Sequence, residues 1–164
     1  VTLGASEAVD IAFRCILNDG DEVIILKPAY VAYEPLVTMS GGVVKCVELK
    51  EENDFKLTPE DLLNAITPKT KVLLMNFPSN PTGGVMTKED LDKIVPIIKE
   101  NNIMVFSDEI YAELCYDEKH YSIASYPEIR DQVLLISGFS KAAFSTSLPI
   151  LNLISSSLSN TSTR

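Results

Sequence analysis

The sequence is poor in the side chains that bind metal ions. It holds a single histidine, His120, and three cysteines, Cys15, Cys46 and Cys115, which are widely spaced and form no CxxC pair. Cysteine and histidine metal centres need clustered ligands. We therefore expect no metal site, and we expect free thiols, buried or half-buried, in a reducing cytosol. His120 follows charged residues in a polar segment, where we expect it to be solvated.

Basic clusters and long apolar runs are also missing. The net charge is −9 and no run of lysine and arginine occurs, which argues against nucleic-acid binding. Apolar runs such as VIIL and VLLM are far too short to cross a membrane. No secretory or transit signal opens the chain, although without an initiating Met its native N-terminus is not in view. We expect a cytoplasmic protein with one domain.

Apolar strands alternate with amphipathic helices along the chain. Expected strands cover residues 22–26, 43–49, 71–77, 103–109 and 132–138. Expected helices cover 6–17, 30–39, a segment after Thr58 that starts at Pro59, and 87–100. Apolar strands separated by helices are typical of parallel sheets that are buried on both faces. The sequence therefore predicts an α/β fold with a mainly parallel sheet covered by helices.

Two charged residues follow apolar strands at what becomes one edge of such a sheet. Asp108 ends the segment IMVFSD, and Lys141 follows VLLISGFS. Ligands bind beyond the carboxyl ends of parallel strands. A pyridoxal phosphate (PLP) site needs a reactive lysine and an acid facing the pyridinium nitrogen. A lysine drawn out of water there has a lowered pKa, as a nucleophilic amine requires.

The same region has a simpler interpretation that the residues leave open. Either Asp108 or Glu109 is able to face a protonated ring nitrogen, which would offset the cost of a buried carboxylate. Alternatively, Asp108 caps a helix over residues 109–113. Tyr111 follows three residues after Asp108 and places its hydroxyl on the same side.

Three other segments carry weaker signals. Gly4-Ala5-Ser6 precedes the first helix and leaves N–H groups open to an anion, although Ser6 alone also serves as an N-cap. Tyr30 follows a strand and either stacks on a cofactor ring or covers the core. The loop PSNPTGG fixes an irregular backbone around Asn80, which indicates either a functional loop or a plain turn.

The order of these motifs resembles one protein family. GASEA, PAY, NPTG, SDEIY and SGFSK occur at the intervals found in class I and II aminotransferases, the aspartate aminotransferase-like enzymes of PLP fold type I. The resemblance runs from residue 1 to about residue 144. It implies a PLP-dependent transferase that moves an amino group from an L-amino acid to a 2-oxo acid. Relatives of full length are expected to be homodimers.

The resemblance also implies a role for each matching residue. Lys141 would form a Schiff base with the cofactor and move the proton, and Asp108 would keep the pyridine nitrogen protonated. Asn80 and Tyr111 would bind the phenolic oxygen, and Tyr30 would stack on the ring. The implied cofactor contacts are Gly4, Ala5, Ser6, Tyr30, Asn80, Asp108, Tyr111, Ser140 and Lys141, and the implied catalytic residues are Lys141, Asp108 and Tyr111.

The chain departs from the family pattern after Lys141. The family continues with a Gly-Trp-Arg type segment whose arginine binds phosphate, whereas this chain reads AAFSTSLPILNL and its one later arginine is Arg164. Ten of the last twenty residues are Ser or Thr. We interpret 1–144 as a partial PLP-binding large domain without the small domain. Residues 145–164 are interpreted as a disordered or frameshifted tail.

This departure leaves alternatives to an active aminotransferase. We expect weak or no transamination from the chain as it stands, because the residues that capture the substrate carboxylate are missing. One alternative is a PLP-dependent β-lyase on the same fold, acting on cystathionine-like substrates. Another is a catalytically dead remnant that acts as a binding module. A nucleotide-binding domain is disfavoured, since neither GxGxxG nor GxxxxGK[ST] occurs.

Overall fold

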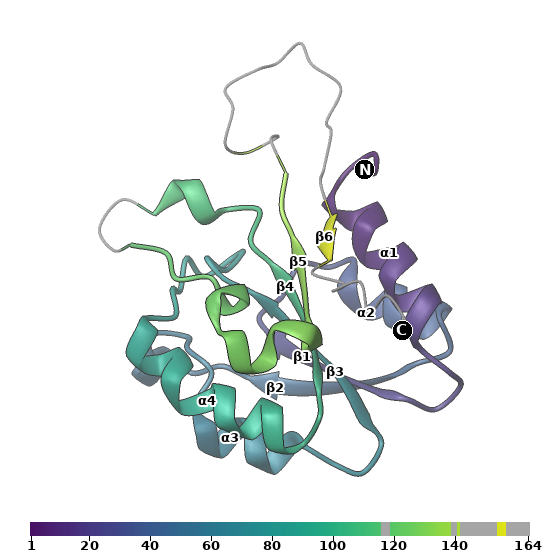
Figure 1. Ribbon diagram of the computed structural model, residues 1–164, viewed down its shortest axis with the longest axis horizontal. Helices are drawn as coiled ribbons and strands as arrows, with labels where there is room; N and C mark the ends of the chain where they lie inside the picture. Colours follow the sequence, from purple (N-terminus) through teal and green to yellow (C-terminus); the bar gives the residue numbers. More distant parts are fainter. Residues whose placement is uncertain (116–118, 139–140, 142–153, 157–164) are drawn as a thin grey trace, which may run out of the picture.

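A six-stranded sheet with helices on both faces forms the body of the protein (Figure 1). The computed structural model describes residues 1–115, 119–138, 141 and 154–156. The strands are β1 (Glu22–Lys27), β2 (Val43–Glu48), β3 (Thr70–Asn76), β4 (Met104–Asp108), β5 (Val133–Ile136) and β6 (Ile154–Ser156). They lie in the order β2-β1-β3-β4-β5-β6, with β1 to β5 parallel and β6 antiparallel to β5. The predicted mainly parallel α/β fold is confirmed.

The register of the central strands places polar residues side by side at one edge of the sheet. Asn76, the last residue of β3, pairs with Asp108, the last residue of β4. Asp108 pairs in turn with Ile136 at the end of β5. The middle residues of β1, β3 and β4 are buried, as expected for strands covered on both faces. The ends of these strands therefore bring polar groups together at this edge of the sheet.

In the described part of the chain, four α-helices cover the sheet: α1 (Ala5–Ile16), α2 (Tyr33–Met39), α3 (Pro59–Ala65) and α4 (Lys88–Glu100). Helices α1 and α2 lie on one face and α3 and α4 on the other (Figure 1). On the first face Phe13 of α1 stacks on Phe106 of β4, with ring centroids 5.0 Å apart. On the second face Ile94 of α4 belongs to the core that contains Leu73 of β3.

Side-chain caps define where α3 and α4 begin. The Thr58 hydroxyl accepts a hydrogen bond from the Asp61 N–H, and Pro59 occupies the first turn of α3, as predicted. Thr87 and Asp90 form a capping box at the start of α4. Helix α4 runs through Pro96, which is exposed. Short 3₁₀ helices complete the chain: η1 (Glu51–Asn53), η2 (Ala112–Leu114), η3 (Ile123–Ser125) and η4 (Pro127–Gln132).

The structure differs from the sequence prediction at two places. Helix α2 begins at Tyr33 rather than at residue 30, because residues 30–32 form a turn closed by a hydrogen bond from the Tyr33 N–H to the Tyr30 carbonyl. Residues 154–156 form a sixth strand within the segment that we expected to lack regular structure. This strand pairs with β5, which would otherwise expose its unpaired backbone groups. Residues 145–153 and 157–164 lie outside the described part, so the disordered tail stays a prediction there.

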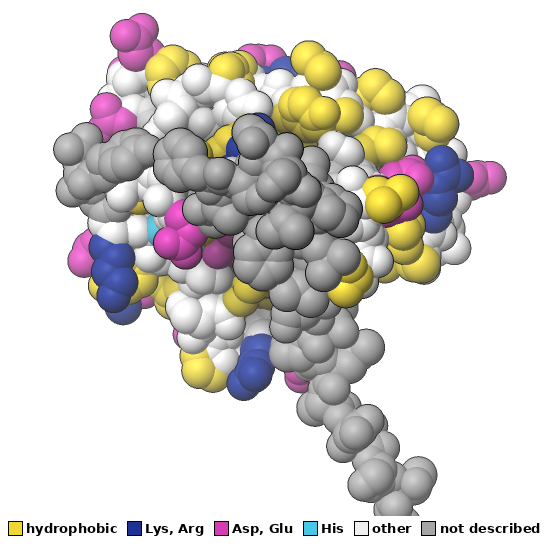
Figure 2. All heavy atoms as spheres, turned by 90° about the horizontal axis from the view of Figure 1, so that it is seen from above, with side chains coloured by type: hydrophobic (Ala, Val, Ile, Leu, Met, Phe, Trp, Pro, Cys, Tyr) yellow, Lys and Arg dark blue, Asp and Glu magenta, His cyan; other side chains and the backbone are white. Residues whose placement is uncertain are grey.

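None of the helices in the part of the chain that is described is long and apolar enough to cross a membrane. Lysine and arginine side chains are scattered over the face shown in Figure 2 instead of forming one patch.

Candidate functional site

A cavity of about 340 Å³ lies at the edge where β3 and β4 end. Its lining residues are Gly4, Ala5, Ser6, Tyr30, Tyr33, Asn76, Asn80, Asp108, Ile110, Tyr111 and Lys141. All the predicted cofactor contacts are present except Ser140, which lies outside the described residues. The volume falls within the range of about 300–1,000 Å³ that is usual for ligand pockets. Segments from both ends of the chain therefore meet in one ligand-sized space.

Asp108 provides a buried carboxylate at the base of this cavity. The residue is 4% exposed. One carboxylate oxygen accepts a hydrogen bond from the Tyr33 hydroxyl at 2.7 Å, and the other accepts from the Ile110 N–H at 3.2 Å. Burial raises the pKa of Asp108, and the two hydrogen bonds partly oppose this rise. A cation placed against the carboxylate would stabilise its charged form.

Tyr33 was not among the predicted site residues. Burial and the nearby Asp108 carboxylate together raise the pKa of its hydroxyl, so Tyr33 remains a hydrogen-bond donor. Tyr33 also contacts Tyr30 edge-to-face, with ring centroids 5.5 Å apart. The turn at residues 30–32 places both rings beside the cavity. In the sequence, Tyr33 read as an ordinary residue of a helix, and only the fold brings it to Asp108.

The loop over residues 78–84 is fixed to the ends of β3 and β4 by side-chain amides. The Asn76 side chain donates to the Asp108 carbonyl at 2.9 Å and accepts from the Asn80 N–H at 3.0 Å. The Asn80 amide then donates to the Tyr111 hydroxyl at 3.2 Å. Asn80 and Tyr111 are thus brought together as predicted, while the bridging Asn76 was missed. Its one signal was its place as the polar last residue of an apolar strand.

The N-terminus of α1 opens into the cavity through residues 4–6. Gly4 is the N-cap, with φ at +147°, and no side chain caps the helix. Ser6 is therefore not an N-cap, which removes the alternative explanation for its hydroxyl. N–H groups in the first turn of a helix have no partner within the helix. Because the helix dipole is positive at this end, the arrangement suits an anionic group.

Lys141 and Tyr30 line the cavity but remain open to solvent. Tyr30 is 39% exposed, so its ring is not buried in the core. Lys141 is also exposed, which contradicts our expectation that it is drawn out of water. The lysine follows the apolar end of β5 along the chain, but it lies at the rim of the sheet. Lys141 is therefore not buried, but it lines the same cavity as Asp108.

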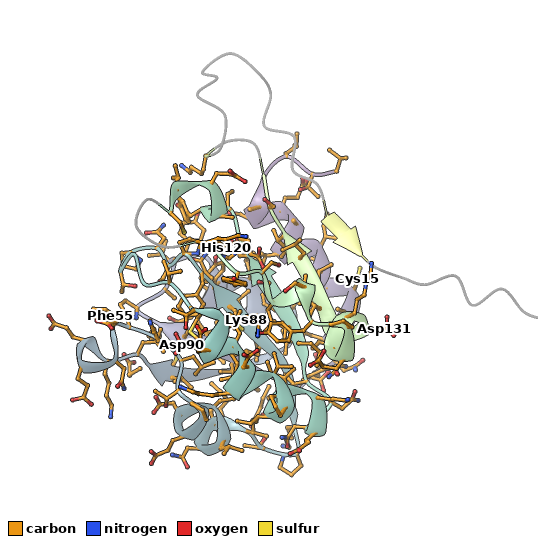
Figure 3. All side chains as sticks on the ribbon, turned by 60° about the vertical axis from the view of Figure 1, so that its left-hand side comes forward. Cys15, Phe55, Lys88, Asp90, His120 and Asp131 are labelled. Atoms are coloured by element: carbon orange, nitrogen blue, oxygen red, sulfur yellow. The ribbon has the colours of Figure 1, made fainter. Side chains whose placement is uncertain are left out.

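His120 contradicts our prediction of a solvated side chain. Its side chain is 14% exposed, and Nε2 lies 2.7 Å from a carboxylate oxygen of Glu109. Figure 3 shows His120 within the body of the protein, far from Cys15 on α1. Cys15 and Cys46 are exposed free thiols rather than buried ones. Within the described residues no group of three or more His, Cys, Asp or Glu side chains is arranged to hold a metal ion.

A family model describing aminotransferases of class I and II matches residues 1–147. The chain belongs to this family. Among its relatives, the putative aminotransferase YugH of Bacillus subtilis is 49% identical over 142 residues, which cover 87% of this chain and 37% of the relative. An aspartate aminotransferase of Bacillus sp. strain YM-2 is 46% identical over 144 residues, with the same two coverages.

Solved aminotransferase structures share the fold. The aromatic aminotransferase from Pyrococcus horikoshii superimposes with a TM-score of 0.89 at 38% identity, covering 94% of this chain and 41% of that chain. A Thermus thermophilus aspartate aminotransferase double mutant gives a TM-score of 0.85 at 40% identity, over 91% and 38%. This chain therefore spans about two-fifths of the length of its relatives.

The described residues fit the cofactor of this family. Class I and II aminotransferases use PLP, which has a basic ring nitrogen, an anionic phosphate and an aldehyde. The cavity offers a buried carboxylate, a helix N-terminus and a lysine to these three groups.

Proposed function

We propose that this chain forms the cofactor-binding part of a PLP-dependent aminotransferase that moves an amino group from an L-amino acid to a 2-oxo acid. The observation that carries the proposal is that Asp108 and Lys141 line one cavity together with the N-terminus of α1. An accidental pocket has no reason to join an acid, an amine and an anion site. The relatives support the reaction class, because they are aminotransferases.

Asp108 would hold the proton on the ring nitrogen of the cofactor. Tyr33 and the Ile110 N–H keep its carboxylate in place. A cation facing Asp108 would lower its raised pKa, so that the acid is ionised when the site is filled. When bound, PLP supplies an aldehyde that accepts amines and a ring that withdraws electrons from the α-carbon of the substrate.

Lys141 would attach the cofactor covalently and carry the proton to and from the α-carbon of the substrate. The Lys141 side chain is exposed on the cavity lining, so its amine is accessible to a bound aldehyde. Asn80 and Tyr111, already hydrogen-bonded to each other, would donate to the phenolic oxygen. Tyr30 would stack on the ring, and residues 4–6 would bind the phosphate through backbone N–H groups. Ser140 is proposed as a further cofactor contact.

The assembly and location of the protein belong to the same proposal. We expect the full-length protein to act as a homodimer in the cytoplasm, where the thiols of Cys15, Cys46 and Cys115 would remain reduced. Its substrates would be an amino acid and a 2-oxo acid.

Product analysis in a single turnover tests the proposal. The PLP-loaded chain is incubated with L-aspartate or an aromatic L-amino acid, and the products are quantified. Equal amounts of 2-oxo acid and pyridoxamine phosphate from the wild type, with none from Lys141→Ala, would support amino-group transfer. Release of ammonia without pyridoxamine phosphate would point to the β-lyase alternative. A folded chain that binds no PLP would overturn the proposal, whereas a loaded chain that yields no product would match the weak or absent transamination expected from the sequence.

A further inference from the structure

Glu109 is a buried acid for which the proposed function has no use. The residue is 5% exposed, directly after Asp108. One of its carboxylate oxygens accepts hydrogen bonds from the Ser107 hydroxyl at 2.9 Å and the Ser122 hydroxyl at 2.8 Å. The other lies 2.7 Å from Nε2 of His120. A buried carboxylate is costly unless it is hydrogen-bonded, and these neighbours offset that cost.

The ring of His120 is oriented by the same contact. Its Nδ1 atom is buried and has no hydrogen-bond partner in the described structure. A hydrogen on Nδ1 alone would leave that donor unmet and set the Nε2 lone pair against the carboxylate. A neutral ring with its hydrogen on Nε2 avoids both costs. His120 therefore acts as a donor to Glu109.

The side chains of Glu109 and Asp108 lie on opposite faces of the sheet. Side chains alternate along a strand, so Ser107 and Glu109 share one side while Asp108 faces the cavity on the other. The Glu109 N–H donates to the Ile136 carbonyl at the end of β5 at 2.8 Å. Its own carbonyl accepts from the Ala112 N–H, which directly follows Tyr111. Glu109 is thus bonded to Asp108 along the chain and hydrogen-bonded to the end of β5 and to Ala112, the residue after Tyr111.

The segment that holds Glu109 is itself anchored in the core. Ser122 is the N-cap of η3, and its hydroxyl also accepts a hydrogen bond from the Ala124 N–H at 3.2 Å. Ile123 is almost completely buried against the α4 side of the sheet. Residues 120–123 are therefore held against the end of β4 on the α4 side of the sheet, opposite the cavity.

We propose that Glu109, held by His120 and Ser122, is a positioning residue that fixes the Asp108 carboxylate and the Tyr111 segment from the face opposite the cavity. The proposal deepens the proposed function and rests on it for the identity of the bound group. The hydrogen-bond partners of the Glu109 carboxylate, Ser107, Ser122 and His120, do not line the cavity, so Glu109 positions the site through the backbone it shares with Asp108 and through its hydrogen bond to β5.

The Ile110 amide reports this positioning directly. Its N–H donates to the Asp108 carboxylate, so its hydrogen exchange depends on where that carboxylate lies. Exchange is measured in the PLP-free chain for the wild type, Glu109→Gln and Ser122→Ala. Glu113→Gln is the matched control, because Glu113 is exposed on η2 and only four residues away. The apparent Kd for PLP is measured on the same four proteins.

Glu109→Gln leaves one acceptor oxygen where the carboxylate has two, and it turns the hydrogen bonds from His120, Ser107 and Ser122 from charge-assisted into neutral ones. Such a loss corresponds to an effect of about tenfold. We expect about tenfold faster exchange at Ile110 and about tenfold weaker PLP binding, with amides of β1 and β2 unchanged. Ser122→Ala removes one donor to Glu109 together with the cap of η3, and it is expected to give a smaller change of the same kind at Ile110. Glu113→Gln is expected to match the wild type.

Two results would separate this inference from its premises. Faster exchange confined to residues 120–125, with Ile110 and PLP affinity unchanged in both variants, would show that Glu109 only ties down a loop and would overturn the inference. If the wild type binds no PLP, the Ile110 exchange still decides the positioning role, and the result counts against the proposed function alone. If Glu109→Gln does not fold, Ser122→Ala carries the same comparison.

Discussion

The buried carboxylate of Asp108 lowers the stability of the ligand-free protein. This carboxylate is buried in the lining of the cavity, and burial raises its pKa above the ordinary value of 3.8. At neutral pH the acid is ionised in the unfolded chain, where water solvates it fully. The folded, ligand-free protein therefore bears an electrostatic cost at this position.

Replacing Asp108 with Asn is expected to stabilise the ligand-free chain. The gain is full at neutral pH and shrinks as the pH falls through the raised folded-state pKa, because the folded wild type then takes up a proton before the unfolded chain does. Below about pH 3.8 the gain disappears. Thermal unfolding checks this, since each kcal/mol shifts the Tm by about 2–4 °C in a chain of this size. Equal Tm values for the two proteins at neutral pH would contradict the account.

The same substitution is expected to weaken PLP binding by at least about tenfold, since Asn carries no charge to hold the ring proton. A titration of both proteins with PLP measures this. Undiminished affinity in Asp108→Asn would remove Asp108 from the cofactor site.

Asn76 is expected to matter as much as the residues that the sequence singled out. Asn76→Ala removes the bridge between the Asp108 carbonyl and the Asn80 N–H. Leaving both groups without a partner costs about 1–3 kcal/mol in unfolding free energy. Urea unfolding and a PLP titration are expected to show losses in both stability and affinity. Asn64→Ala on the exposed side of α3 is the matched control and should change neither by a comparable amount.

At the scale of elements, local patterns predicted most of the fold. The apolar runs predicted β1, β3 and β4 because strands covered on both faces need no polar side chains. Thr58 and Pro59 predicted the start of α3 because a cap is a local interaction. The prediction that His120 is solvated was wrong because its partner Glu109 lies eleven residues away and the two side chains meet only in the folded chain. The predicted start of α2 was wrong because the turn at residues 30–32 resembles a helix in sequence.

A substitution in the capping box of α4 is expected to lower stability without changing PLP binding. Thr87→Ala removes the acceptor for the Asp90 N–H and is expected to cost about 1 kcal/mol of unfolding free energy. The cap lies on the α3–α4 side of the sheet and is not part of the cavity lining. PLP affinity is therefore expected to stay at the wild-type value. A large loss of affinity would mean that α4 supports the site more directly than its contacts indicate.

At the scale of the whole molecule, the order of the strands in the sheet determines which residues meet in the candidate site. The sequence predicted that Asp108 and Lys141 follow strands, but not that β3 lies between β1 and β4. That order brings Asn76 and Asp108 into register and sets Tyr33, from the segment after β1, against Asp108. Motif order therefore predicted eight of the eleven lining residues, whereas Tyr33, Asn76 and Ile110 became visible only in three dimensions.

The central claim is that Lys141 binds PLP covalently in the cavity that contains Asp108. The purified chain is mixed with PLP, reduced with borohydride and mapped by peptide mass spectrometry. We expect a reduced phosphopyridoxyl group on Lys141 in the wild type and in Lys99→Ala, a control at an exposed lysine of α4, and none in Lys141→Ala. An unchanged adduct in Lys141→Ala, or no adduct in a wild type with native circular dichroism, would contradict the claim.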